Sequence, residues 1–152
     1  MLLTMIFKYI SGNKLNHAII SGKKINNNKK IPIINYAVEN NIKPKIIQNE
    51  FKKISNNIDN NFRIALKLSL FNFDINLIKE TVDLFIKKDI KILIDAENEE
   101  LYNIYNETCD ELTWNYNKNK VKILKTYQMY RTDSYNLLEY DINYAKNDNL
   151  YH

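Results

Sequence analysis

Ile92-Leu93-Ile94-Asp95-Ala96-Glu97 is a short apolar run that passes directly into acidic residues. Roughly thirty residues later, the length of one strand-helix-strand unit, a second apolar run passes into Thr126-Tyr127-Gln128-Met129-Tyr130. An α/β barrel presents its catalytic groups in this way, at the carboxyl ends of successive strands. The two segments therefore predict parallel strands with a candidate site at one rim.

Apolar runs recur along the whole chain and predict four strands. The expected strands are Ile31–Val38, Phe62–Leu70, Ile90–Asp95 and Val121–Tyr127. Between and after them, apolar residues recur every three or four positions, which indicates amphipathic helices. These helices are expected at Pro44–Ile58, Asp74–Lys88, Glu99–Tyr116 and Thr132–Ala145. Alternating strands and helices favour an α/β fold, a parallel sheet with crossover helices.

A leading helix is expected at Lys14–Lys24, broken by Gly22. Asp74 is a predicted N-cap of the helix that it begins, and Thr132 or Asp133 is expected to do the same for the last helix. No linker interrupts the pattern, and 152 residues suit one domain with a substantial core. We therefore expect residues 1–152 to form one domain.

Composition excludes several classes of function. The net charge is +4, but the lysine pairs are spread along the chain, whereas nucleic-acid-binding proteins more often gather them on one face, so we expect no nucleic-acid partner. The single cysteine and the two distant histidines offer no metal-ligand pattern. With two glycines there is no glycine-rich phosphate loop. The apolar start, Met1–Phe7, is too short to span a membrane.

Lys67 is a candidate binding residue on the second expected strand. Alternate side chains of a strand face opposite sides, so Lys67 faces away from the apolar side chains next to it in the sequence. In an open two-layer sheet it would point to solvent. In a barrel it would point into the interior, where a lysine needs an anionic partner. The sequence leaves both alternatives open.

Asp95 closes the third expected strand at a place that corresponds to Lys67 on the second. In a parallel sheet these ends lie at the same pole, where a cation and a carboxylate can flank a small zwitterion. The alternative for Asp95 is a helix cap or a loop salt bridge. Gln128 follows the fourth strand, and its amide, which both donates and accepts, suits a flavin or amide edge. The alternative for Gln128 is an exposed polar residue.

Four segments in order resemble the strand motifs of the proline dehydrogenase (proline oxidase) family. They are Ile31–Glu39, Ala65–Ser69, Leu93–Glu97 and Thr126–Tyr130. Met5–Gly12 is also similar to the approach to the first strand of that family. One departure is Asn35, which stands where the family usually has Asp. The agreement in order and spacing covers nearly the whole chain.

The resemblance implies a (βα)8 TIM-type barrel that oxidises L-proline to 1-pyrroline-5-carboxylate with FAD as hydride acceptor and a quinone as the next electron acceptor. By the same resemblance, Lys67 would bind the proline carboxylate and Asp95 would be a catalytic carboxylate in the substrate pocket. Ala96 would contact the flavin, and Gln128 would hydrogen-bond its ring edge. Members of this family work at the mitochondrial inner membrane, on its matrix face, or, in bacteria, in the cytoplasm or at the membrane periphery.

The resemblance also implies that much of the barrel is missing. The family carries an Arg-Gly-Ala-Tyr-like flavin segment and an arginine pair beyond the matched strands, and a barrel of this type needs about 200 residues or more. We therefore expect a partial barrel, about the first half, that a second polypeptide or a second copy completes. The alternative is an inactive half-barrel that self-associates, because open strand edges invite pairing.

Overall fold

The computed structural model describes residues 14–38 and 42–147. The motif segment Met5–Gly12 and the motif residue Glu39 lie outside the described residues. The described chain contains four parallel strands in the order β1-β2-β3-β4. These strands are β1 (Ile33–Asn35), β2 (Arg63–Leu66), β3 (Lys91–Ile94) and β4 (Ile123–Lys125). The predicted α/β class, with parallel strands and crossover helices, is confirmed.

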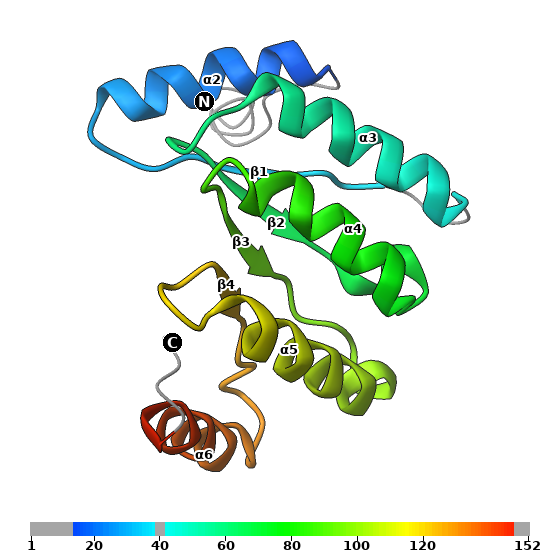
Figure 1. Ribbon diagram of the computed structural model, residues 1–152, viewed down its shortest axis with the longest axis vertical. Coiled ribbons are helices and arrows are strands. Elements are labelled where there is room, and N and C mark those ends of the chain that lie inside the picture. Colours follow the sequence, from blue (N-terminus) through cyan, green and yellow to red (C-terminus); the bar gives the residue numbers. More distant parts are fainter. Residues whose placement is uncertain (1–13, 39–41, 148–152) are drawn as a thin grey trace, which may run out of the picture.

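Helices follow each strand and cover one face of the sheet (Figure 1). The crossover helices are α3 (Pro44–Asn57), α4 (Ile75–Ile86) and α5 (Tyr102–Tyr116). Two further helices, α2 (Leu15–Asn27) and α6 (Ser134–Asn147), lie at opposite ends of the molecule. Short 3-10 turns occur at η1 (Leu68–Phe71) and η2 (Glu99–Leu101). Asp74 caps α4 as predicted, because its carboxylate accepts the N–H groups of Asn76 and Leu77.

The core lies between the sheet and the crossover helices. One level of the sheet carries an isoleucine on every strand, and the register places these four side chains side by side. They are Ile34, Ile64, Ile92 and Ile123, all of them buried. The opposite face of the sheet is more open: Ile33 is 52% exposed and Leu124 is 38% exposed. The strands therefore have a packed outer face and an open inner face.

The second strand is shorter than predicted. It ends at Leu66, and the chain turns into η1 instead of continuing to Leu70. The tight turn brings Leu68 and Phe71, three residues apart, into the core together, since side chains at this spacing share a side of a 3-10 helix. Burial of these two side chains therefore decides the conformation after Lys67, although the apolar alternation extends to Leu70.

Gly22 does not break the first helix, so that prediction was wrong. Gly22 is buried inside α2, and a Cβ added there would lie 2.3 Å from Cε1 of Phe62. Glycine costs about 1 kcal/mol in a helix relative to alanine. Here its missing side chain lets α2 approach the ring of Phe62, which is itself buried. Close packing, and not flexibility, is the reason for this glycine.

The expected apolar stripe of α6 consists of Tyr135, Leu138, Ile142 and Ala145, and only part of it is buried. Tyr135 and Ile142 are exposed, whereas the helix buries Ser134, Asp141 and Ala145. Asp141 is buried because it pairs with Lys125 of β4. The spacing of apolar residues cannot predict which face of a helix is buried when that face is held by an ion pair. Within the described residues, no helix combines the length and the apolar character that crossing a bilayer requires.

The thiol of Cys109 is buried in α5, and this burial raises its pKa to about 12. Because the thiolate is the reactive form, Cys109 in the folded chain is expected to resist alkylation and disulfide exchange at mildly alkaline pH. Unfolding in urea should expose it to rapid reaction with Ellman's reagent. Equal reaction rates with and without urea would show that the thiol is not enclosed by the fold.

Candidate active site

Lys67 and Asp95 lie at the same pole and on the same side of the sheet. Leu66 and Ile94 are register partners, and each is followed directly by one of the two charged residues. The N–H of Asp95 donates to the carbonyl oxygen of Leu66 at 2.9 Å, which carries the pairing one step past the strands. Leu66 and Ile94 are buried, so Lys67 and Asp95 face the open inner side.

The anionic partner of Lys67 is Glu97. Its Oε2 lies 3.8 Å from Nζ of Lys67, and its Oε1 accepts the N–H of Ser69 at 2.8 Å. Glu97 is 5% exposed, whereas the side chain of Lys67 is 49% exposed. A buried carboxylate thus lies beside the ammonium of a lysine whose side chain is still half exposed to solvent. Lys67 therefore combines the two alternatives left open by the sequence, solvent exposure and an anionic partner.

Glu97 belongs to the Leu93–Glu97 motif but was not among the site residues predicted from the sequence. One signal could have found it. Glu97 follows Asp95 by two positions, and alternation along a strand would place both on the side of Lys67. An inward lysine needs a carboxylate, so either Asp95 or Glu97 was a candidate partner. The burial of Glu97 and its bond to Ser69 distinguish the two residues.

Asp95 remains exposed at the rim. Its Oδ1 accepts the N–H of the next residue, Ala96, at 3.1 Å, and this contact is not a helix cap, because η2 has Asn98 at its N-cap position. That contact leaves the carboxylate at the surface of the open inner face. Ala96, half-buried beside it, adds no side chain that would block approach to this rim.

Gln128 is fixed in place by its neighbours. Its Nε2 donates to the carbonyl oxygen of Glu97 at 2.8 Å. The backbone carbonyl oxygen of Gln128 accepts hydrogen bonds from the hydroxyl of Ser134 at 2.8 Å and from the N–H of Arg131 at 2.9 Å. Gln128 is half-buried and joins the loop after β3 to the start of α6. Residues from three consecutive strand ends, Lys67, Glu97 and Gln128, are therefore linked at one rim.

The end of β4 is held by a second set of polar contacts. The hydroxyl of Thr126 donates to the carbonyl oxygen of Ile94 at 2.8 Å. The Tyr105 hydroxyl donates to the Thr126 carbonyl at 2.9 Å and accepts the Thr126 N–H at 3.1 Å. Burial raises the pKa of Tyr105 well above its ordinary value, so this hydroxyl stays neutral. These contacts fix the backbone at Thr126, two residues before Gln128.

Lys125 lies on the helix-facing side of the sheet and forms a separate network. Its side chain is 2% exposed, and Nζ lies 2.9 Å from a carboxylate oxygen of both Asp110 and Asp141. Tyr127 donates its hydroxyl to Asp141 at 2.7 Å. Burial opposes the charge of Lys125, but the hydrogen bonds to the two carboxylates outweigh it and raise the lysine's pKa. This network joins β4, α5 and α6.

The comparisons with solved structures place the fold. The chain is similar to the crystal structure of proline utilization A (PutA) from Bdellovibrio bacteriovorus inactivated by N-propargylglycine, with a TM-score of 0.80 and 13% sequence identity. The match covers 99% of this chain and 20% of that chain, so the chain spans a fifth of the protein that it matches. At this identity the likeness concerns the fold, and it supports the predicted partial barrel.

The sequence comparisons give the family. A search of curated proteins found no significant match. The family model described as proline dehydrogenase matches residues 15–152. This range includes β1 to β4 and every site residue described above. The chain belongs to the proline dehydrogenase family.

Proposed function

We propose that this chain forms part of a catalytic barrel that oxidises L-proline to 1-pyrroline-5-carboxylate, with FAD as hydride acceptor and a quinone as the final electron acceptor. The observation that carries the proposal is the convergence of Lys67, Asp95 and Gln128 at the carboxyl rim of the sheet, in a chain of the proline dehydrogenase family. Ligands of α/β barrels bind at this rim.

The two charged residues suit a zwitterionic amino acid. The ammonium of Lys67 would bind the substrate carboxylate, and Glu97 would position Lys67 for that contact. Asp95, level with Lys67, would face the substrate nitrogen. Holding both charged ends fixes the orientation of the ring beside the hydride acceptor, and orientation is a large part of the catalysis of such a step.

The residues beside this pair fit one edge of a flavin ring. Gln128 carries a side-chain amide that can donate and accept. Its Nε2 donates to the carbonyl oxygen of Glu97, and Ser134 bonds its backbone carbonyl oxygen. Ala96 is small, and Leu93 and Leu124 supply apolar surface on the same open face. When bound, FAD would supply the hydride-accepting chemistry that amino acid side chains lack. Ala96 and Gln128 would hold its ring edge.

A second polypeptide or a second copy of this chain would complete the barrel. The support for this part of the proposal is the open inner face, where Ile33 and Leu124 are exposed on the side that a closed barrel would enclose. These residues lie on the two edge strands of this face, β1 and β4, and exposed apolar surface is typical of places that another chain covers.

Substitution of two lysines on the inner face of the sheet, Lys67 and Lys91, tests whether Lys67 binds the substrate. Lys67→Met is expected to lower kcat/KM for proline-driven dye reduction by about 10-fold to 100-fold, the loss expected for one charge-assisted hydrogen bond. Lys91→Met is the matched control, because Lys91 lies on the inner face at the opposite end of β3. Equal losses in the two variants would contradict a binding role for Lys67.

The second candidate is a non-catalytic half-barrel that self-associates, and the exposure of Ile33 and Leu124 favours it. The purified chain distinguishes the two. Flavin absorbance together with proline-driven dye reduction supports the enzyme. A colourless, inactive protein that elutes as a dimer in size-exclusion chromatography with light scattering supports the half-barrel.

A further inference from the structure

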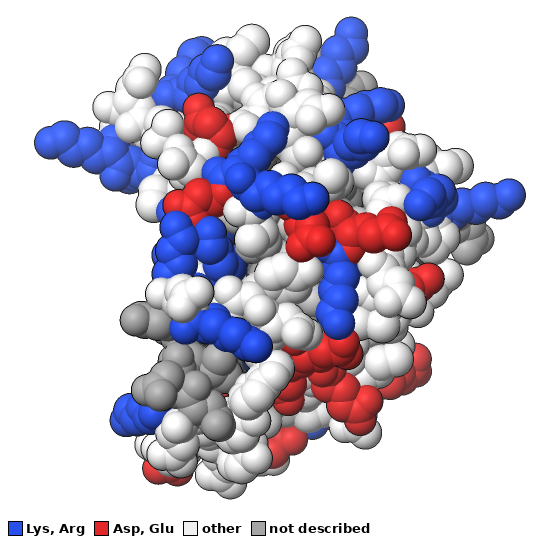
Figure 2. All heavy atoms as spheres, viewed as in Figure 1, with Lys and Arg blue, Asp and Glu red and all other residues white. Residues whose placement is uncertain are grey.

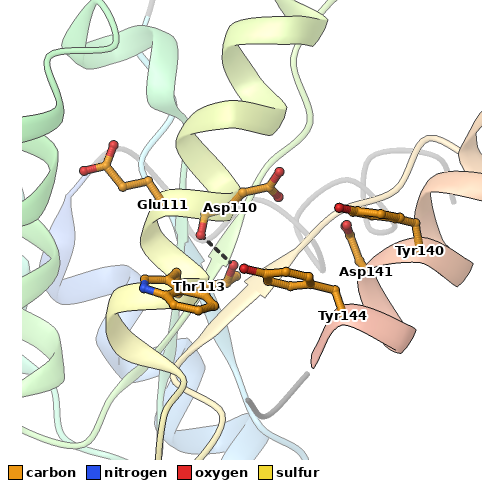
Figure 3. A pocket seen from close by; sticks show the side chains of 7 residues that line it. Asp110, Glu111, Thr113, Tyr140, Asp141 and Tyr144 are labelled. Atoms are coloured by element: carbon orange, nitrogen blue, oxygen red, sulfur yellow. Dashed lines mark hydrogen bonds between the residues drawn. The ribbon is translucent and has the colours of Figure 1, made fainter. Parts of the chain in front are cut away.

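A pocket of about 380 Å³ lies between α5 and α6, away from the rim (Figure 3). Its lining consists of acidic and aromatic side chains and one threonine. These residues are Asp110, Glu111, Thr113, Trp114, Tyr140, Asp141 and Tyr144. The hydroxyl of Thr113 donates to the carbonyl oxygen of Asp110, within α5. The groups that remain to contact a ligand are therefore the carboxylates and the aromatic rings. The volume of the pocket is in the range of small-molecule sites.

Three aromatic rings form one wall of this pocket. The ring centroids of Trp114 and Tyr144 are 5.7 Å apart, and those of Tyr144 and Tyr140 are 6.2 Å apart and nearly parallel, at 13°. Figure 3 shows Tyr140 and Tyr144 extending from α6 toward α5. The rings of Trp114 and Tyr140 are partly open to solvent. The face of an aromatic ring carries negative potential and attracts cations.

Carboxylates surround these rings. Asp110, Asp141 and Glu111 line the pocket, and the cations paired with them are Lys125 and Lys79. Within residues 14–38 and 42–147, three lining carboxylates are paired with two lysines, which leaves one negative charge in excess. Figure 2 shows acidic side chains gathered over the lower part of the molecule, where α5 lies. The pocket therefore combines negative ring faces with a negative net charge.

We propose that this pocket binds a small organic cation of the quaternary ammonium class. A methylated ammonium is large, weakly hydrated and unable to donate hydrogen bonds, so it gains from ring faces as well as from the excess carboxylate charge. The buried Lys125 is already satisfied by Asp110 and Asp141, and it keeps these two carboxylates in place at the pocket. This site is separate from the proposed proline site, because it lies between helices and shares none of the rim residues.

The unaltered chain provides the first test. Trp114 is the only tryptophan in the sequence and lines the pocket, so its fluorescence reports on occupancy. Choline chloride should change this fluorescence in a saturable way, with half-saturation in the millimolar range. Sodium chloride at equal ionic strength, and 3,3-dimethyl-1-butanol, the neutral isostere of choline, should not. A linear response, or an equal response to the neutral isostere, would overturn the proposal.

Matched variants locate the binding. Tyr140→Leu and Asp110→Asn are each expected to weaken choline binding about 3-fold, the effect of one exposed cation–π contact or one charge. The controls are Tyr135→Leu and Glu139→Gln, both on exposed positions of α6 outside the pocket. Each control should bind choline as the unaltered chain does. Equal weakening in a control and its partner would overturn the assignment to this pocket.

Discussion

Phe51→Ala is expected to lower the free energy of unfolding by about 3–5 kcal/mol, the usual cost of removing a buried phenylalanine. Phe51 is 0% exposed and lies at the centre of an aromatic cluster. Its ring centroid is 5.7 Å from that of Tyr36, 5.8 Å from Phe71 and 6.2 Å from Phe85. The variant leaves a cavity where α3, η1 and α4 meet. Urea unfolding followed by circular dichroism measures the loss.

The control for Phe51 lies on the same helix. Ile46→Ala truncates an apolar side chain that is 51% exposed, and surface changes of this kind usually stay within about 0.5 kcal/mol. If Phe51→Ala does not fold, Phe51→Leu fills part of the cavity and should give a smaller, measurable loss. Equal stability of the Phe51→Ala and Ile46→Ala variants would mean that Phe51 is not at the centre of the core.

Asn117→Ala is expected to cost about 3 kcal/mol or more, because buried polar groups that lose their partners cost about 1–3 kcal/mol each. Asn117 is fully buried at the end of α5. Its Oδ1 accepts the N–H groups of Lys122 and Ile123, and its Nδ2 donates to the carbonyl oxygen of Ile123, each at 2.9 Å. Alanine would leave these three backbone groups at the start of β4 without partners.

A nearby asparagine serves as the comparison for Asn117. Asn115 is exposed and donates to the carbonyl oxygen of Glu111, one turn earlier in α5. Asn115→Ala should change the unfolding free energy by about 0.5 kcal/mol or less, because water replaces the lost bond. Thermal unfolding of both variants at one pH gives the difference. A similar melting temperature for the two would show that the Asn117 contacts are not needed to hold β4.

The order of strands and helices was predictable because burial follows two simple periods. Alternation marked Ile64, Leu66, Ile92 and Ile94, and these side chains are buried as a strand against helices requires. Departures came where a tertiary contact overrides the local pattern. Gly22 lies inside α2, where its missing side chain makes room for the ring of Phe62.

Part of the candidate site was also predictable, because parallel register fixes which residues share a rim. Lys67 and Asp95 lie level on neighbouring strand ends, as the spacing of the strands indicated. Glu97 and Asn117 were not identified. The carboxylate of Glu97 accepts a hydrogen bond from the N–H of Ser69, which lies 28 positions away in the sequence, and a local pattern does not reveal such a contact. Asn117 is one of many asparagines, most naturally interpreted as turn residues, and only its burial distinguishes it.

The last helix has little hydrophobic attachment. Among the described residues of α6, the buried ones are Ser134, Asp141 and Ala145, and alanine contributes little apolar area. Such a helix should detach as a separate cooperative unit, at a lower free energy than the rest of the molecule. Detachment would break the hydrogen bond from Ser134 to Gln128, and it would also remove Tyr140 and Tyr144 from the wall of the pocket. Fluctuations of α6 are therefore expected to disturb the rim and the pocket at the same time.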